Sequence, residues 1–132
     1  MYNNRVVLNS HKDELDPRPS RFLEEHIHLL PRGRALDIAM GQGRNAIYLA
    51  WMGFEVEGVD ISVEAVRTAL RLAGEKGVSI RAETADLGKN YRIQPDSYDL
   101  IVCFNYLQRS LMSQIKDGLK KGGMIVYETF II

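Results

Sequence analysis

From residue 35 onward, short apolar runs alternate with amphipathic stretches along the chain. The apolar runs predict strands at 35–39, 54–59, 78–83, 98–104 and 124–132. Apolar residues at helical spacing predict helices at 44–53, 62–76 and 107–120. Strands that alternate with helices form parallel sheets with right-handed crossovers and helices on both faces. The pattern therefore predicts an open α/β fold with a mainly parallel sheet of about five strands.

The N-terminal part of the chain has a different pattern. Residues 1–18 are polar, contain Pro17 and show neither period, which indicates an N-terminal arm. Ser20 is expected to cap a packing helix that ends at Pro31. Glycines at 53, 77 and 122–123 follow three of the predicted helices, where a C-terminal glycine is common. We expect one domain at 19–132 behind the arm.

Composition narrows the class of protein. A chain of 132 residues with 45% hydrophobic content forms one domain with one core. The 17 basic residues balance 17 acidic ones, so net charge indicates neither a nucleic-acid nor a membrane partner. The polar N-terminus does not resemble a signal peptide, and no apolar run approaches the ~18 residues of a membrane span.

The cysteine and histidine content indicates no metal site. Cys103 is the only cysteine, which excludes an internal disulfide and favours a reducing compartment. We therefore expect a cytoplasmic protein in which this thiol is buried and structural. His26 and His28 are two residues apart and do not share a helix face, so both are expected at the surface. His11 in the arm is a remote candidate for the site.

A glycine-rich loop carries the strongest functional signal. The sequence LDIAMGQGRNA at 36–46 joins a predicted strand to a predicted helix. Glycines let the backbone turn sharply and approach a ligand, and the helix N-terminus offers N–H groups to an anion. The stretch also matches the dinucleotide pattern G-x-G-x-x-G/A, with Asp60 about twenty residues further on. S-adenosylmethionine and NAD are therefore both candidate ligands, and a purely structural turn is the third reading.

Two features favour S-adenosylmethionine over NAD. Asp37 places a carboxylate near the end of a strand that is expected to be buried on both faces. Such burial is unfavourable unless the carboxylate bonds the loop or reaches a ligand. A dinucleotide also needs a second mononucleotide-binding half, and this chain ends after about five strands.

The same residues resemble a known family. LDIAMGQGRNAIYLA and GFEVEGVDIS resemble motifs I and II of class I S-adenosylmethionine-dependent methyltransferases, and most of all the small tellurite-resistance-type bacterial group. Residues 85–87, YDLIVCFNYLQRSL and LKKGGMIVYETF resemble the later motifs, so the resemblance spans about 19–132. It implies a Rossmann-like sheet of order 3-2-1-4-5, S-adenosylmethionine as cofactor, and a small-molecule or metalloid methyl acceptor.

The chain departs from the family pattern at three points. Ala39 replaces the first glycine of the loop, which permits close approach if its φ is negative. Lys121 replaces a proline that is common before Gly122. The chain also lacks the usual C-terminal edge hairpin. A last strand left at the edge of the sheet offers unpaired backbone groups, so we expect a homodimer, or else a truncation that removes the covering segment.

The resemblance assigns the site residues. Asp60 accepts the ribose hydroxyls, Ile61 packs on adenine or belongs to the core, and Asp86 accepts from the adenine amino group or is a solvated loop residue. The implied cofactor-binding set is Asp37, Ala39, Met40, Gly41, Gly43, Asn45, Asp60, Ile61, Asp86, Leu87, Cys103 and Phe104. Arg44 is expected at the surface.

Residues after the fourth strand are candidates for the acceptor side. Asn105, Tyr106 and Arg109 face the methyl group or the acceptor in one reading, and begin a packing helix in the other. Methyl transfer is an in-line displacement that needs no dedicated base. The open alternative of another class is a non-catalytic module that binds the cofactor and acts through association.

Overall fold

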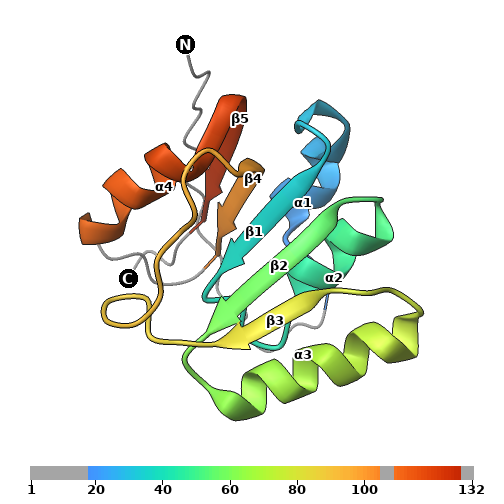
Figure 1. Cartoon of the computed structure of the whole chain (residues 1–132). Coiled ribbons are helices and arrows are strands. Elements are labelled where there is room, and N and C mark those ends of the chain that lie inside the picture. Colours follow the sequence, from blue (N-terminus) through green and yellow to red (C-terminus); the bar gives the residue numbers. More distant parts are fainter. Residues whose placement is uncertain (1–17, 105–108, 129–132) are drawn as a thin grey trace.

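A five-stranded parallel sheet forms the centre of the computed structural model, which describes residues 18–104 and 109–128 (Figure 1). The strands lie in the order β3-β2-β1-β4-β5. Their bounds are β1 Arg34–Ile38, β2 Glu55–Asp60, β3 Arg81–Thr84, β4 Tyr98–Cys103 and β5 Leu119–Tyr127. The parallel sheet and the order 3-2-1-4-5 are therefore confirmed.

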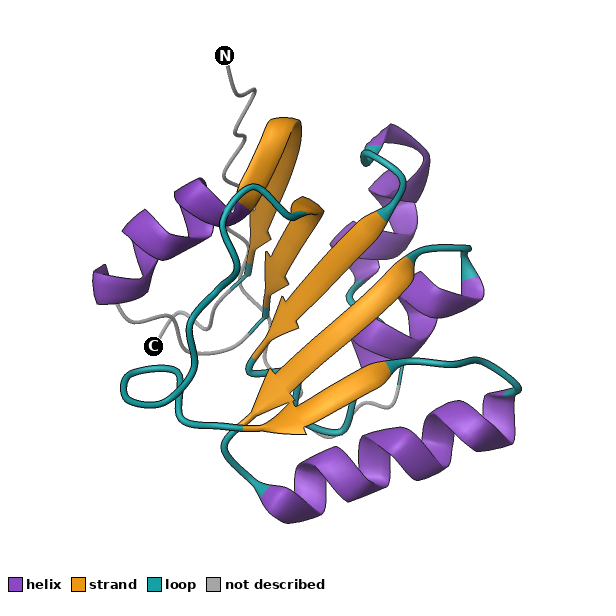
Figure 2. Ribbon diagram, viewed as in Figure 1, coloured by secondary structure: helices purple, strands orange, loops and turns teal. Residues whose placement is uncertain are grey.

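Helices cover both faces of this sheet, as expected (Figure 2). On one face lie α1 (Arg21–His26), α2 (Arg44–Trp51) and α3 (Val63–Lys76), which pack against apolar side chains of β1, β2, β4 and β5. On the other face α4 (Met112–Gly118) packs against β1, β4 and β5. None of the helices in the described part of the chain is long and apolar enough to span a bilayer.

The N-terminal helix begins where the sequence predicts. The Ser20 hydroxyl accepts a hydrogen bond from the Leu23 N–H at 3.3 Å, which confirms the cap. The helix then ends at His26 and continues as a short 3-10 turn over Ile27–Leu29, so it is not one helix up to Pro31. Residues 1–17 lie outside the described residues, and the division into an arm and a domain stays a prediction.

The C-terminal elements differ most from expectation. Helix α4 ends at Gly118, not 120, and β5 begins at once at Leu119, five residues before the predicted strand. The prediction that glycines 122–123 follow a helix is wrong. Gly122 has a φ of +83° and lies in a bulge of β5, where the register passes from the Tyr98–Leu119 pair to the Leu100–Met124 pair. Residues 107 and 108, the first two of the predicted helix, lie outside the described residues.

All five strands run parallel, so their carboxyl ends meet at one edge of the sheet. The residues that end the first four strands are Ile38, Asp60, Thr84 and Cys103. Strand order reverses between β1 and β4. Open α/β sheets bind ligands outside such a switch point. The ligand site is therefore expected at this edge of the sheet.

Candidate functional site

The loop between β1 and α2 is fixed by backbone hydrogen bonds. The Met40 N–H donates to the Val59 carbonyl of the neighbouring strand at 3.0 Å, and the Gly43 N–H donates to the Met40 carbonyl at 3.0 Å. Gly43 then caps α2, since its carbonyl accepts from the Ile47 N–H at 2.7 Å. The loop is therefore a defined turn, and Met40 is buried beneath it.

The two loop glycines are required for different reasons. Gly41 and Gly43 have φ values of +59° and +86°, in the left-handed region that favours glycine. A Cβ on Gly43 would lie 2.8 Å from the Cβ of Ala69 on α3, so this glycine permits close helix packing. A Cβ on Gly41 would meet no described atom within 4 Å. Gly41 therefore faces open space, where its backbone is accessible to a ligand.

Ala39 corrects an expectation about the loop. Its φ is +56°, not negative. An L-residue with a Cβ is disfavoured there, because the Cβ approaches the following carbonyl oxygen. The hydrogen bond from Met40 to Val59 fixes the chain just after Ala39 and thereby holds it in this conformation.

Asp60 joins the end of β2 to the loop. Its Oδ2 accepts from the Gly41 N–H at 2.8 Å, and its Oδ1 accepts from the Ser62 N–H at 2.9 Å. Each carboxylate oxygen has a second lone pair. The half-buried carboxylate therefore orients the loop and still offers acceptors, as binding of two ribose hydroxyls requires.

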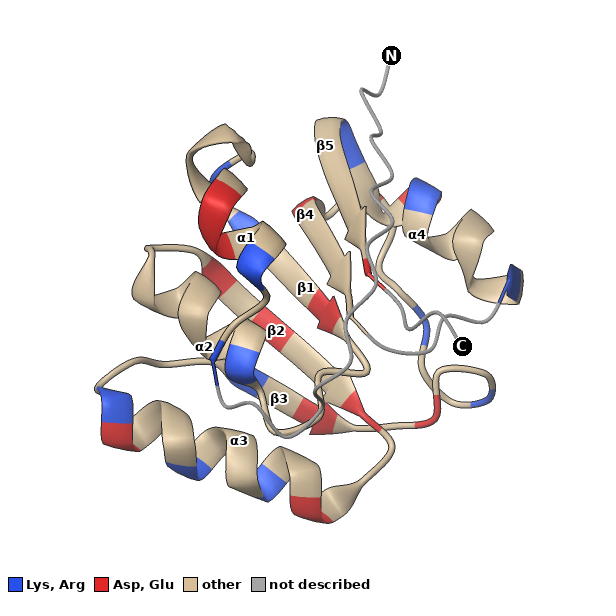
Figure 3. Ribbon diagram, turned by 180° about the vertical axis from the view of Figure 1, so that it is seen from behind, with Lys and Arg blue, Asp and Glu red and all other residues tan. Residues whose placement is uncertain are grey.

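Asp37 lies near the end of β1 with 2% of its surface exposed. Burial raises the pKa of its carboxyl group to about 8, the negative charge of Asp60 adds to the rise, and Arg44 together with the Ala46 N–H opposes it. Its Oδ2 accepts no hydrogen bond from any residue that the structure describes. Figure 3 shows acidic positions near the carboxyl ends of β1 and β2. A cationic donor bound here would satisfy this oxygen and restore its charge.

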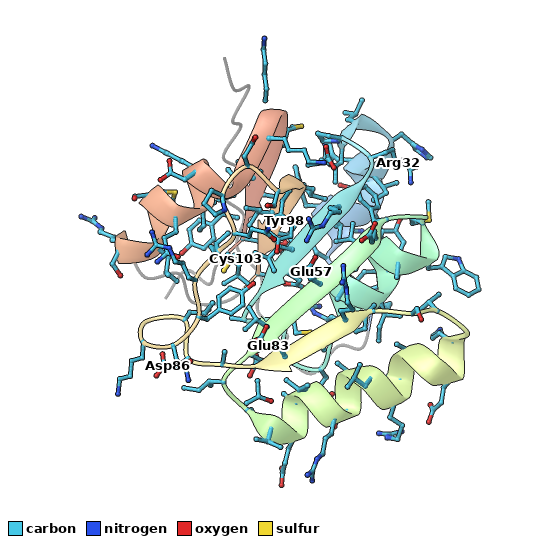
Figure 4. The ribbon with its side chains drawn as sticks, viewed as in Figure 1. Arg32, Glu57, Glu83, Asp86, Tyr98 and Cys103 are labelled. Carbon is cyan, nitrogen blue, oxygen red and sulfur yellow. The ribbon has the colours of Figure 1, made fainter. Side chains whose placement is uncertain are left out.

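The residues predicted for the adenine side lie at the ends of β2 and β3. Ile61 is 69% exposed, so it does not belong to the core and offers a free apolar surface. Asp86 lies beyond the end of β3 (Figure 4). Its Oδ1 accepts from the Gly88 N–H at 3.0 Å, so the carboxylate closes a turn of the loop. Leu87 is half-buried against the core on the α4 side.

Cys103 is the last residue of β4, and Phe104 follows it. Both are buried, with 0% and 2% exposure, and the Cys103 carbonyl accepts from the Glu128 N–H at 2.8 Å. The expectation of a buried thiol is confirmed. Arg109 is exposed at the start of a 3-10 turn, Arg109–Leu111. Asn105 and Tyr106 lie outside the described residues, so the acceptor side stays a prediction.

Sequence reasoning placed Asn45 at the site but missed two polar residues that join it there: Ser20, which was predicted only as a helix cap, and Glu128. Asn45, in the first turn of α2, accepts through its Oδ1 from the Ser20 N–H at 2.6 Å. The Ser20 hydroxyl donates to the carboxylate of Glu128 at 2.5 Å. Ser20 and Glu128 are each only 3% exposed. The signal in the sequence was the single acid within MIVYETFII, since the argument that selected Asp37 also applies to Glu128.

The polar and apolar groups of S-adenosylmethionine can be matched to the residues at this edge of the sheet. The cofactor presents two ribose hydroxyls, an ammonium group, a carboxylate group and the flat aromatic faces of adenine. Asp60 offers acceptors for the hydroxyls, Asp37 has a buried acceptor without a described partner, and Ile61 offers apolar surface. At Gly41 no described atom lies within 4 Å of where a Cβ would be, so a ligand can approach the backbone there. The residues present therefore fit this cofactor.

Comparison with known proteins agrees with that fit. Residues 35–123 match the family model described as a methyltransferase domain. The chain is 30% identical over 121 residues to a ubiquinone biosynthesis O-methyltransferase from Burkholderia ambifaria, covering 88% of this chain and 52% of that protein. The chain thus spans about half the length of the curated relatives that it matches.

Solved structures give the same family. An S-adenosylmethionine-dependent methyltransferase from Mesorhizobium loti shares 28% identity with a TM-score of 0.66, covering 79% of this chain and 51% of that one. A TehB-like methyltransferase from Corynebacterium glutamicum shares 26% identity with a TM-score of 0.63, covering 76% and 57%. Special closeness to the tellurite-resistance-type group is not confirmed, since curated relatives are named as ubiquinone biosynthesis enzymes. The sequence motifs, the fold and the family match together show that the chain belongs to the class I S-adenosylmethionine-dependent methyltransferases.

Proposed function

We propose that this domain transfers a methyl group from S-adenosylmethionine to a small-molecule acceptor. The observation that carries the proposal is the buried carboxylate of Asp37, whose Oδ2 has no partner among the described residues and lies at the base of the glycine loop. Gly41 in that loop faces open space. A buried acceptor beside an open backbone is a ligand-binding arrangement, and family membership supports the identity of the ligand.

The residues of the chain bind and orient the reactants. Asp60 holds the loop through the Gly41 N–H and presents free lone pairs to hydroxyl groups. Asp37 offers its unpartnered oxygen to an ammonium group. When bound, S-adenosylmethionine supplies a methyl group on a positively charged sulfur. Alignment of an acceptor behind such a methyl group, with water excluded, provides most of the rate enhancement in a displacement of this kind.

The finer identity of the acceptor rests on the relatives. Proteins that share 26–30% identity with this chain are named as ubiquinone biosynthesis O-methyltransferases, which supports a hydroxyl acceptor on a small molecule. The resemblance of the sequence motifs to the tellurite-resistance-type group makes a metalloid the second candidate acceptor. We propose the hydroxyl acceptor first, because the curated relatives align over 88% of the chain.

The test is methyl transfer from labelled S-adenosylmethionine to a catechol, an aromatic thiol and tellurite, assayed in parallel. Wild-type protein should label the catechol, and Asp60→Ala should lose at least ~90% of that activity because it removes hydrogen bonds at the cofactor site. Label on tellurite alone would support the metalloid acceptor instead. Binding of the cofactor without transfer to any of the three would favour the non-catalytic module.

A further inference from the structure

Three buried polar residues from distant parts of the chain meet beside the glycine loop. Ser20 precedes α1, Asn45 lies in the first turn of α2, and Glu128 follows β5. Their exposed fractions are 3%, 4% and 3%. Ser20 connects the other two, since its N–H donates to Asn45 and its hydroxyl donates to Glu128. Buried polar groups are stable only when they are hydrogen-bonded, so these contacts depend on one another.

The start of α2 holds the segment Arg18–Ser20 at two points. Arg44 donates through its Nη1 to the Arg18 carbonyl at 3.0 Å, and Asn45 accepts from the Ser20 N–H at 2.6 Å. Arg44 and Asn45 directly follow Gly43, the last residue of the loop. A shift of Arg18–Ser20 would therefore displace Arg44 and Asn45, and with them the end of the glycine loop.

Glu128 anchors the same cluster to the sheet. Its N–H donates to the Cys103 carbonyl at 2.8 Å, which extends the pairing of β5 with β4 by one bond. Its carboxylate accepts from Ser20, whose hydroxyl also accepts from the Leu23 N–H as the cap of α1. Glu128 thus connects the carboxyl end of the sheet to α1 and, through Ser20, to α2.

We propose that Ser20, Asn45 and Glu128 form a positioning network that holds the glycine loop in its cofactor-binding conformation. Cofactor binding and docking of Arg18–Ser20 then stabilise each other, because coupling between two binding events is reciprocal. The inference rests on the proposed function, since it concerns the same cofactor. It makes Glu128 a positioning residue that acts through Ser20 and Asn45.

Calorimetric titration with S-adenosylhomocysteine tests the network. Glu128→Ala should weaken the affinity about tenfold, which corresponds to ~1.4 kcal/mol. Glu128→Gln keeps an oxygen that accepts from Ser20, so its affinity should stay within about threefold of wild type. Two controls should bind as wild type does: Glu83→Ala removes an exposed carboxylate on β3, and Ile115→Val lowers stability on the opposite face.

Hydrogen exchange of the wild-type protein gives a second readout that needs no variant. The N–H groups of Leu23 and Glu24 bond to the hydroxyl and carbonyl of Ser20. Their exchange should slow when S-adenosylhomocysteine is bound. Unchanged exchange at both amides, or wild-type affinity in Glu128→Ala, would overturn the network. Failure of the wild-type protein to bind S-adenosylhomocysteine would instead overturn the proposed function, and this inference with it.

Discussion

Asp37 lies near the end of β1, and Asp60 ends the neighbouring strand β2. The two carboxyl groups have different surroundings and therefore different roles. Asp60 is half-buried and holds two backbone N–H groups, from Gly41 and Ser62. Asp37 is buried, and one of its oxygens has no partner among the described residues. Asp60 therefore shapes the loop, whereas Asp37 retains binding capacity that a ligand can use.

Burial of Asp37 predicts a pH-dependent stability. Its pKa rises from 3.8 to about 8 because burial disfavours the charged form. The folded protein thus keeps a proton that the unfolded chain releases above about pH 4. This contribution is fully present below pH 4 and is lost as pH rises to about 8, by up to ~1.4 kcal/mol per unit. Asp37→Asn should remove the slope.

Urea unfolding of both proteins between pH 5 and pH 8 measures this effect. The stability of Asp37→Asn relative to wild type should increase steadily with pH over that range. Equal slopes for the two proteins would show that Asp37 is already ionised in the folded state.

The positive φ of Ala39 predicts a stabilising substitution. Glycine adopts +56° without steric strain, whereas an L-residue in the left-handed region costs about 1–2 kcal/mol. Glycine also loses more backbone entropy on folding, which offsets part of the gain. Ala39→Gly should therefore raise the free energy of unfolding by about 0.5–1 kcal/mol. Thermal unfolding of the two proteins without ligand measures this difference. A lower stability of Ala39→Gly than of wild type would show that Ala39 is not strained.

Among the secondary-structure elements, the strands carry a polar network on the same face of the sheet as α4. The network includes Tyr98, the first residue of β4. Glu57 on β2 pairs with Arg34 on β1 and with Arg81 on β3 at 3.4 Å. Tyr98, the first residue of β4, donates its hydroxyl to Glu57 at 2.7 Å. Figure 4 shows Tyr98 and Glu57 side by side on the sheet. The network joins the four strands β1 to β4.

This arrangement predicts that Tyr98→Phe destabilises the fold without affecting the site. Tyr98 is 2% exposed, and loss of its hydroxyl removes one donor from the partly buried Glu57. The expected loss is about 1 kcal/mol in urea unfolding. Tyr48→Phe is the matched control, and we expect it to change stability by less than ~0.5 kcal/mol. A change in S-adenosylhomocysteine affinity in Tyr98→Phe would contradict the separation of network and site.

Element boundaries show which parts of the fold local sequence determines. Helix α3 was predicted at 62–76 and spans Val63–Lys76, because Ser62 caps its start and Gly77 adopts a φ of +76° at its end. Helix α4 stops at Gly118, a glycine that the prediction passed over in favour of Gly122 and Gly123. A Cβ there would lie 2.6 Å from Cγ2 of Ile93, so tertiary packing fixes the position.

At the site, too, some features follow from local sequence and others depend on tertiary contacts. The glycine loop and Asp60 follow from spacing along the chain. The φ of Ala39 does not, because it depends on a hydrogen bond to the neighbouring strand. The Ser20–Glu128 contact joins residues 108 positions apart, so the sequence shows a polar residue in an apolar run but not its partner.

At the scale of the whole molecule, β5 lies at one edge of the described sheet. Among the described residues it pairs only with β4. Backbone groups of β5 that have no strand partner in the described part of the chain, together with its apolar residues, are a template for strand pairing. We propose that this 132-residue chain forms a homodimer along β5. Sedimentation velocity over a hundredfold concentration range should show a monomer–dimer equilibrium, and a single monomer species at every concentration would contradict the proposal.

We propose that the carboxyl edge of the sheet binds S-adenosylmethionine through the glycine loop and Asp60. The most direct test is calorimetric titration of wild-type protein and Asp60→Ala with S-adenosylhomocysteine, with NAD as the parallel ligand. We expect wild type to bind S-adenosylhomocysteine and not NAD, and Asp60→Ala to bind at least ~10-fold more weakly because it loses hydrogen bonds to the ribose. Binding of NAD alone, or equal affinity of the two proteins for S-adenosylhomocysteine, would contradict this mode of cofactor binding.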